Sequence, residues 1–375
     1  MVAQRRMGKT SLLREFQRRS DGERTCVYVD LQKAKDAPEA IVEISLALKR
    51  QSGLSDGVLS VFGNTIEKLG TMVEKISIGD LGVTLRAGLN AGNWSKKGSE
   101  LLEVVAGSEQ HAVLMLDEVP ILANRLLKGS DYTITPERRE ALDEFMSWLR
   151  ECASRHRGQL SIILTGSIGF EPILRQAGLS ATLNSFAPFE LLPWDDETAT
   201  GCLIALARQR ELDFEEGATE ELLSRLGCNI PHHVQTYFDR LHETCHRRGD
   251  DTITRDDVAR VYEERMLSTR GHAELTHYED RLKMLLGHEA LPMALDLLTE
   301  AATVGHVSDE ALRSLREDHE RDGFQASLAL DEIRRVLEHD GYLRMTDRGL
   351  VFVSKLLRDW WKARHGFAYV EVARR

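Results

Sequence analysis

Two features are missing from this 375-residue sequence, and each argues against a class of protein. No apolar run approaches the roughly 20 residues that a membrane-spanning helix needs, and the polar, basic start does not resemble a signal peptide. The five cysteines include no C-x-x-C pair, which predicts reduced thiols and disfavours a cysteine-rich zinc site. We therefore expect a soluble protein of the cytoplasm.

Positive charge is also scarce. The chain has 49 Lys and Arg against 60 Asp and Glu, so its formal net charge is −11. This balance disfavours a protein that coats nucleic acid, because neutralising phosphates requires clustered Lys and Arg. A local basic patch is still compatible with this net negative charge. Apolar residues make up 42% of the chain, which at this length predicts two or three domains with ordinary cores.

The first chemical feature lies at the start of the chain. Gly8-Lys9-Thr10 matches the last part of the phosphate-loop pattern G-x-x-x-x-G-K-[ST] and leads into a helical pattern. In such a loop backbone N–H groups surround the phosphates, the Lys reaches the β- and γ-phosphates and the Thr hydroxyl binds Mg²⁺. The residues predicted to bind nucleotide are Gln4, Arg5, Arg6, Met7, Gly8, Lys9, Thr10 and Ser11.

This loop departs from the full pattern in two ways. Ala3 stands where the first Gly is expected, and only Met1 and Val2 precede it where a buried strand normally launches the loop. We therefore expect the launching strand to be missing from this sequence. The DNA just upstream of the Met1 codon would show whether an apolar stretch continues in frame.

A second feature is an apolar run, His111–Leu116, that ends in two carboxylates, Asp117 and Glu118. A strand buried on both faces looks like this when its carboxyl end meets a ligand. We predict that Asp117 holds Mg²⁺, directly or through water, and that Glu118 polarises an attacking water. The alternative is a core strand followed by a helix N-cap, and the upstream loop favours the first interpretation.

A third strand is predicted at Leu160–Thr165. The polar residues at its end, Thr165 and Ser167, are candidates to sense the γ-phosphate, although an ordinary strand-to-loop turn explains them equally well. A further strand is expected at 25–31, and helices at 37–49, 58–75 and 137–156. Alternation of apolar and polar residues around two glycines predicts a β-hairpin insertion at about 76–92.

Together, residues 5–13, 114–118 and 164–167 resemble the archaeal-type ATPase branch of the STAND P-loop NTPases, which are AAA-related. The resemblance implies an α/β fold with a parallel sheet of the additional-strand catalytic-glutamate type. It also implies ATP and Mg²⁺ as ligands and a regulatory role in signalling or defence. The domains expected are a nucleotide-binding domain at 1–190, a helical lid at 191–270 and a winged helix at 271–375.

Two more site residues are predicted. Residues 227–233 are similar to the Gly/Pro motif at which the STAND lid faces the base, so Pro231 is a candidate base contact; alternatively, Gly and Pro simply separate two helices. The arginine needed in phosphoryl transfer comes from Arg175 or from a neighbouring subunit. Self-association or a protein partner is therefore an open expectation.

A competing motif lies in the expected lid. His242-Glu243-Thr244-Cys245-His246 matches H-E-x-x-H, in which two His bind Zn²⁺ and the Glu acts as a base. The extended zinc-protease pattern needs a third His at the position of Thr252. A zinc metalloprotease is therefore kept only as a remote alternative.

The end of the chain predicts short helices followed by two strands around Asp347-Arg348-Gly349. The helix expected at 328–340 is a poor reader of DNA, because base and phosphate contacts rely on Arg and Lys and here acidic residues outnumber basic ones. A docking or regulatory module is therefore favoured. Arg344 and Arg348 on the hairpin leave open a second hypothesis, a nucleotide-regulated DNA-binding protein with little or no turnover.

Overall fold

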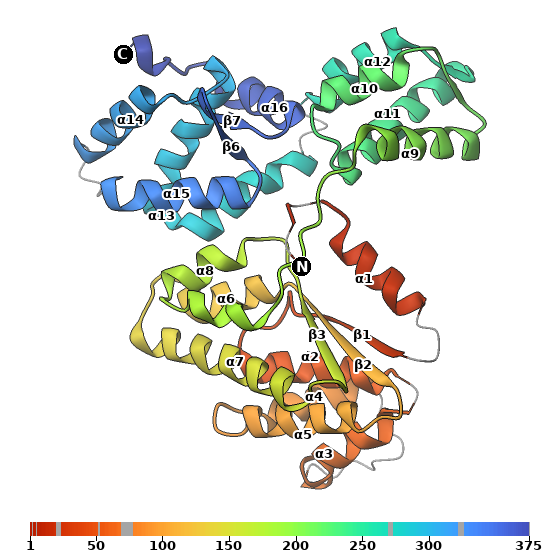
Figure 1. Cartoon of the computed structure of the whole chain (residues 1–375), viewed down its shortest axis with the longest axis vertical. Coiled ribbons are helices and arrows are strands. Elements are labelled where there is room, and N and C mark those ends of the chain that lie inside the picture. The colour runs from red at the N-terminus through yellow and green to blue at the C-terminus, as the bar shows by residue number, and fades with distance from the viewer. Residues whose placement is uncertain are drawn as a thin grey trace. The chain divides into compact units, whose positions relative to one another are not determined.

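The computed structural model describes residues 1, 3–4, 6–19, 24–51, 53–68, 78–268, 273–321 and 326–374. The chain forms two compact units (Figure 1). Unit 1 comprises residues 1–2 and 9–190, and unit 2 comprises residues 3–8 and 191–375. Within the described residues, no helix is both long and apolar enough to cross a membrane.

Unit 1 is built on a three-stranded parallel sheet in the order β1-β2-β3, formed by β1 (Arg24–Asp30), β2 (His111–Asp117) and β3 (Leu160–Leu164). In the register, Leu114 of β2 lies between Val27 of β1 and Ile162 of β3. Because all three strands run the same way, their carboxyl ends share one edge of the sheet, as the sequence predicted for Asp117 and Thr165.

Helices lie on both sides of this sheet (Figure 1). The long helix predicted at 137–156 is present one residue earlier, with Leu142, Phe145 and Leu149 buried. The helices are α1 (Lys9–Arg18), α2 (Ala37–Lys49), α3 (Ser55–Lys68), α4 (Ile78–Gly88), α5 (Trp94–Ala106), α6 (Val119–Lys128), α7 (Pro136–Arg155) and α8 (Phe170–Gln176), followed by a 3-10 turn at Ser180–Ser185. Helix α1 lies on one side of the sheet, and α2 and α7 lie on the other (Figure 1).

The hairpin expected at about 76–92 is wrong for the described part of that range, because residues 78–88 form helix α4. Leu81 and Leu85 are fully buried and lie four residues apart, which is helical spacing. A Cβ at Gly82 would lie 3.4 Å from a methyl carbon of Leu46 in α2, which is an ordinary van der Waals contact. Gly82, which sequence reasoning had taken as a turn signal, therefore lies inside a helix.

Unit 2 begins, after its N-terminal segment, with helices and short strands: α9 (Asp196–Gln209), β4 (Asp213–Phe214), α10 (Ala218–Leu226), α11 (Pro231–Arg248), β5 (Thr252–Ile253), α12 (Arg255–Val261) and a π-helical turn at Tyr262–Met266. It continues with α13 (Ala273–Val304), α14 (Asp309–Arg321), α15 (Ala326–His339), β6 (Leu343–Thr346), β7 (Gly349–Phe352), α16 (Lys355–His365) and a 3-10 turn at Val372–Arg374.

The predicted C-terminal hairpin is confirmed: β6 and β7 pair antiparallel, with Leu343 opposite Phe352. In α13, Gly287 has a φ of 70°, so this element consists of two helices that meet at a kink. The core of unit 2 is one cluster that runs from α9 to α16 and contains Trp360 and Trp361, both fully buried. The structure thus places residues 191–375 in one compact unit. The predicted boundary near residue 270, between the lid and the winged helix, stays a prediction.

Candidate functional site

The carboxyl end of β2 meets the start of α1. Thr10 Oγ1 donates a hydrogen bond of 2.7 Å to Oδ2 of Asp117, across 107 residues of sequence. Asp117 is 2% exposed, and within the described part of the chain it forms no ion pair; its side chain accepts only from Thr10, Tyr28 and the amide of Glu118. A buried carboxylate partnered by hydroxyls and an amide matches the oxygen ligand chemistry that Mg²⁺ prefers.

Lys9 is the first residue of α1 and is 6% exposed. Gly8, just before it, has a φ of +82°, a left-handed conformation that glycine adopts without steric cost. A helix N-terminus preceded by a glycine turn presents backbone N–H groups to an anion. Lys9 adds a cation at the same point of the chain, so this end of α1 suits a phosphate group.

Tyr28 is a site residue that the sequence reasoning missed. Its hydroxyl donates a 3.0 Å hydrogen bond to Asp117 Oδ2, and the guanidinium of Arg14 lies 4.7 Å from the centre of its ring. Burial raises the pKa of Tyr28, and the negative charge of Asp117 raises it further. Tyr28 is therefore a neutral donor that holds Asp117. The strand had been predicted, but only the β1–β2 pairing brings this ring to the carboxylate.

Glu118 follows β2 in a strained conformation. Its φ of 60° is left-handed, which is uncommon for a residue with a side chain and is often found at functional sites. Its Oε2 accepts two hydrogen bonds from Ser167, from the amide at 2.9 Å and from the hydroxyl at 2.6 Å. The structure therefore brings together two residues that the sequence predicted separately.

Thr165 lies at the end of β3 and is 2% exposed. Its backbone N–H donates to the carbonyl of Leu116 and its carbonyl accepts from the amide of Val119, whereas its hydroxyl has no hydrogen-bond partner among the described residues. A buried hydroxyl without a partner is costly and calls for an explanation, such as a ligand that completes it. Thr165 remains a candidate sensor.

The predicted loop residues before Lys9 belong to unit 2 and pack there. Arg6 bonds to the ring of His232 on α11, and the amide of His232 donates to the carbonyl of Arg6 at 3.4 Å. Gln4 lies against Gly341, where an added Cβ would come within 2.3 Å of the Gln4 side chain. Met7 is buried, Ser11 is exposed on α1, and Arg5 lies outside the described residues.

Two further site residues were predicted, Arg175 and Pro231. Arg175 on α8 pairs with Glu171 of the same helix at 2.8 Å and is about half exposed. Pro231 is the buried first residue of α11 in unit 2. Arg175 has no described contact with Asp117 or Glu118, and Pro231 belongs to the other unit, so both roles stay predictions.

The H-E-x-x-H motif lies on α11, as expected for its spacing. The rings of His242 and His246 stack with centres 6.1 Å apart, while Glu243 forms ion pairs with Arg265 and Arg240. Over the described residues, no three His, Cys, Asp or Glu side chains gather closely enough to hold a metal ion. In this structure Glu243 is held by two arginines, and the zinc protease remains only a remote alternative.

No protein-family model matches the chain, and no curated protein matches it. Among solved structures, the chain is similar to the Walker-type ATPase PABY2304 of Pyrococcus abyssi, with a TM-score of 0.57 and 17% identity over 96% of this chain and 89% of that one. This likeness shows the fold: an α/β P-loop NTPase fold with a parallel sheet.

Two weaker matches have TM-scores of 0.37. The RuvB Holliday junction branch migration motor of Thermotoga maritima is 15% identical over 73% of this chain and 78% of that chain. The Orc1 protein of Aeropyrum pernix, solved in complex with DNA, is 13% identical over 98% of this chain and 86% of that chain.

Proposed function

We propose that this protein binds ATP with Mg²⁺ and hydrolyses it slowly, as a STAND-type molecular switch. The observation that carries the proposal is the 2.7 Å hydrogen bond between Thr10 and Asp117. A P-loop hydroxyl and a strand-end carboxylate are the two protein groups that hold Mg²⁺ in P-loop NTPases. The two groups meet although 107 residues separate them in the sequence, and Thr10 directly follows a buried Lys. Packing alone does not readily explain this combination.

Each residue of the proposed site then has its own role in binding or hydrolysis. Lys9 and the amides at the start of α1, with Gly8 before them, bind the β- and γ-phosphates. Thr10 and Asp117 would hold Mg²⁺, which supplies positive charge against the phosphate oxygens. Glu118, held by Ser167, orients and polarises the attacking water. Thr165 senses the γ-phosphate through its unpartnered hydroxyl.

The regulatory part of the proposal rests on unit 2. In the STAND arrangement, residues 191–270 act as a lid with Pro231 at the base, and residues 271–375 as a winged helix that reports the nucleotide state. The β6–β7 hairpin and the helices before it support that assignment. A switch of this kind uses the difference in ligand affinity between two conformations, so that slow hydrolysis resets it.

Calorimetry with ATP and Mg²⁺ tests the site. Lys9→Ala should abolish or strongly weaken binding, because it removes the cation at the phosphates. The matched control is Lys33→Ala, which alters an exposed lysine of the same unit. Equal affinity of Lys9→Ala and wild type would show that the phosphate-loop assignment is wrong.

A second candidate function is nucleotide-regulated DNA binding with little turnover. It is motivated by the β6–β7 hairpin, which exposes Arg344 and Arg348. In a mobility-shift assay, Arg344→Ala with Arg348→Ala should reduce affinity and the salt dependence, since each phosphate contact adds to the salt slope. The control is Arg208→Ala, an exposed arginine of α9. Affinity unchanged by the hairpin variant would eliminate this candidate.

A further inference from the structure

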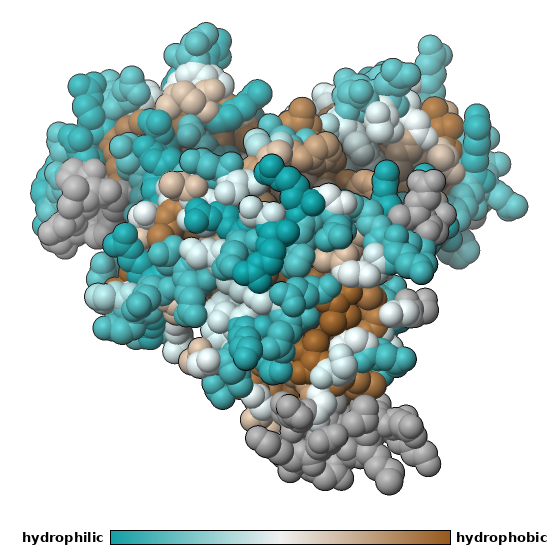
Figure 2. Space-filling model, turned by 60° about the horizontal axis from the view of Figure 1, so that its bottom comes forward, coloured by the Kyte–Doolittle hydropathy of each residue, from teal (hydrophilic) through white to brown (hydrophobic). Residues whose placement is uncertain are grey.

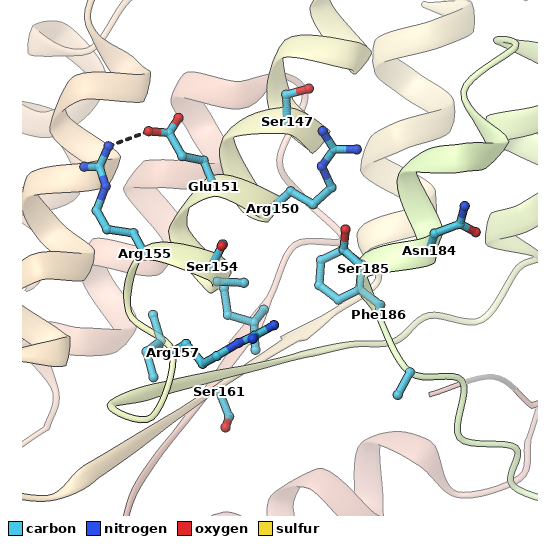
Figure 3. A pocket seen from close by; sticks show the side chains of 14 residues that line it. Ser147, Arg150, Glu151, Ser154, Arg155, Arg157, Ser161, Asn184, Ser185 and Phe186 are labelled. Atoms are coloured by element: carbon cyan, nitrogen blue, oxygen red, sulfur yellow. Dashed lines mark hydrogen bonds and ion pairs between the residues drawn. The ribbon is translucent and has the colours of Figure 1, made fainter.

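A polar groove runs beside helix α7 (Figure 3). It has a volume of about 1050 Å³ and lies between the second half of α7, strand β3 and residues 184–187. All of its lining residues belong to unit 1, and none of them is a residue of the proposed ATP site. Pockets for small molecules usually have volumes of about 300–1,000 Å³, so this groove has room for an organic ligand rather than a single ion.

Helix α7 turns its polar face to the groove. Its apolar residues, such as Leu149, are buried in the core. Ser147, Arg150 and Ser154 are three and four residues apart, so they share one face of the helix. All three line the groove, and so does Arg157 in the turn after the helix. This wall is therefore formed by hydroxyl and guanidinium groups, which donate hydrogen bonds.

Two arginines of this wall have no acidic partner. On a chain with a net charge of −11, an exposed arginine easily finds a carboxylate, as Arg155 does with Glu151 at the border of the groove (Figure 3). Arg150 and Arg157 are exposed as well. Neither guanidinium forms an ion pair or a hydrogen bond with another residue in the part of the chain that the structure describes. Their positive charge is therefore available to a ligand.

The end of α7 opposes an anion only weakly. The last carbonyls of a helix together carry about half a negative charge. Here two carbonyls near the end are engaged, because the amide of His156 donates to the carbonyl of Cys152 and the amide of Leu160 donates to that of His156. Each free guanidinium brings a full positive charge. The charge of Glu151 is offset by Arg155, so the groove favours an anion.

The other wall of the groove is apolar. Leu160 and Ile162 of β3 line it, together with the ring of Phe186. The amide of Phe186 donates to the carbonyl of Leu183 at 2.9 Å, which fixes the backbone here, and its ring lines the same space as Arg157 (Figure 3). In the view of Figure 2, hydrophobic residues gather in one strip and hydrophilic residues surround it. The groove instead combines cations with an aromatic ring, which suits a ligand that has both an anionic and a flat apolar part.

We propose that this groove binds a nucleoside monophosphate, at a second nucleotide site separate from the ATP site. A phosphate monoester carries a charge of about −1.5 to −2 at neutral pH, which Arg150 and Arg157 together match. Their planar donors fit phosphate oxygens in pairs. The base packs on Phe186, since stacking on an aromatic ring requires no particular base. Asn184 and Ser185 supply polar groups for the sugar hydroxyls.

Calorimetry on the full chain carrying Lys9→Ala tests the proposal, because this background removes the lysine of the proposed ATP site. The ligands are AMP, GMP, CMP and UMP. At least one should bind, and Arg150→Ala or Arg157→Ala should weaken it by about tenfold or more, since each removes charged hydrogen bonds to phosphate. The matched control is Arg139→Ala, which removes an exposed arginine of the same helix outside the groove. In the wild-type chain, the amide signals of Ser154 and Ser185 should shift with the same nucleotide.

Phe186→Ala separates recognition of the base from attraction of charge. It should weaken binding of the nucleotide by about tenfold while leaving ribose 5-phosphate, which has no base, unchanged. Binding of none of the four nucleotides, or binding that both arginine variants leave intact, would overturn the proposal. Inorganic phosphate or a capped hexaglutamate peptide that binds as tightly as the best nucleotide would also overturn it, because the groove would then select charge alone. These outcomes do not depend on whether Lys9 binds ATP.

Discussion

The hydroxyl of Tyr28 donates to Oδ2 of Asp117, the same oxygen that accepts from Thr10. Three elements therefore converge on one carboxylate oxygen: α1, β1 and β2. The arrangement orients Asp117 before any ligand arrives, because two donors on different elements fix the plane of the carboxylate. Tyr28 is in this sense a positioning residue for the proposed metal site.

Tyr28→Phe should weaken Mg²⁺-dependent nucleotide binding while leaving binding without Mg²⁺ unchanged. Losing a hydrogen bond to a charged group costs about 1.5 kcal/mol, so the Mg²⁺ concentration for half-maximal binding should rise about tenfold. Titration of Mg²⁺ at fixed ATP measures this shift. Tyr132→Phe, which changes an exposed tyrosine of the same unit, is the control. An equal loss with and without Mg²⁺ would indicate a general packing role.

Glu118→Gln should retain ATP binding and lower the rate of phosphate release by about 10²–10⁴-fold, the usual contribution of a general base. The side-chain amide oxygen of the introduced Gln can still accept from the backbone N–H of Ser167, so the loop geometry is kept. Ser167→Ala removes only the 2.6 Å hydroxyl bond to Glu118 and should cause a smaller loss. If Ser167→Ala instead abolished nucleotide binding, Ser167 would contact the ligand rather than orient Glu118.

Stability should fall in acid through Glu279 of α13. Burial raises the pKa of this carboxyl, but hydrogen bonds from His365 and Arg364 outweigh burial and lower it to about 2. A carboxyl whose pKa is lowered on folding contributes its full stabilisation at pH values above its ordinary pKa of 4.5. This stabilisation is lost as the pH falls toward about 2.

Denaturant melts of wild type and Glu279→Gln between pH 7 and pH 2 measure this contribution. The variant should be less stable at pH 7, and the difference should shrink as the pH falls below 4.5. A constant difference across the range would mean that Glu279 stabilises α13 and α16 by packing instead.

Trp361→Ala should destabilise unit 2 by about 3–5 kcal/mol, because it leaves a cavity in the core. The ring is fully buried, stands edge to face with Trp360 at 5.7 Å, and donates to Thr299. The control is Phe367→Ala, since that ring is fully exposed and should change stability by less than about 0.5 kcal/mol. Similar effects of the two substitutions on chemical denaturation would contradict this assignment of the core.

The elements predicted best were those with long, regular patterns. The apolar run at 111–116 was identified as a strand because few other elements tolerate burial on both faces, and α7 was found within one residue from its spacing and length. The segment at 78–88 failed because it is short and glycine-rich, so a period of two and a period of 3.6 fit it almost equally. Its helical state depends on packing against α2, which the local sequence does not encode.

By itself, the sequence determined which residue types stand at the ends of the elements: Lys9 and Thr10 before a helix, and Asp117 and Glu118 after a strand. Local patterns carry that information because periodicity and turn chemistry act over a few residues.

Only the tertiary structure decided which of these residues meet. Parallel strands are joined by long connections, so the partners of Asp117 and Glu118 lie up to 107 residues away and depend on strand order and register. The same pairing brought Tyr28 to Asp117 and Ser167 to Glu118.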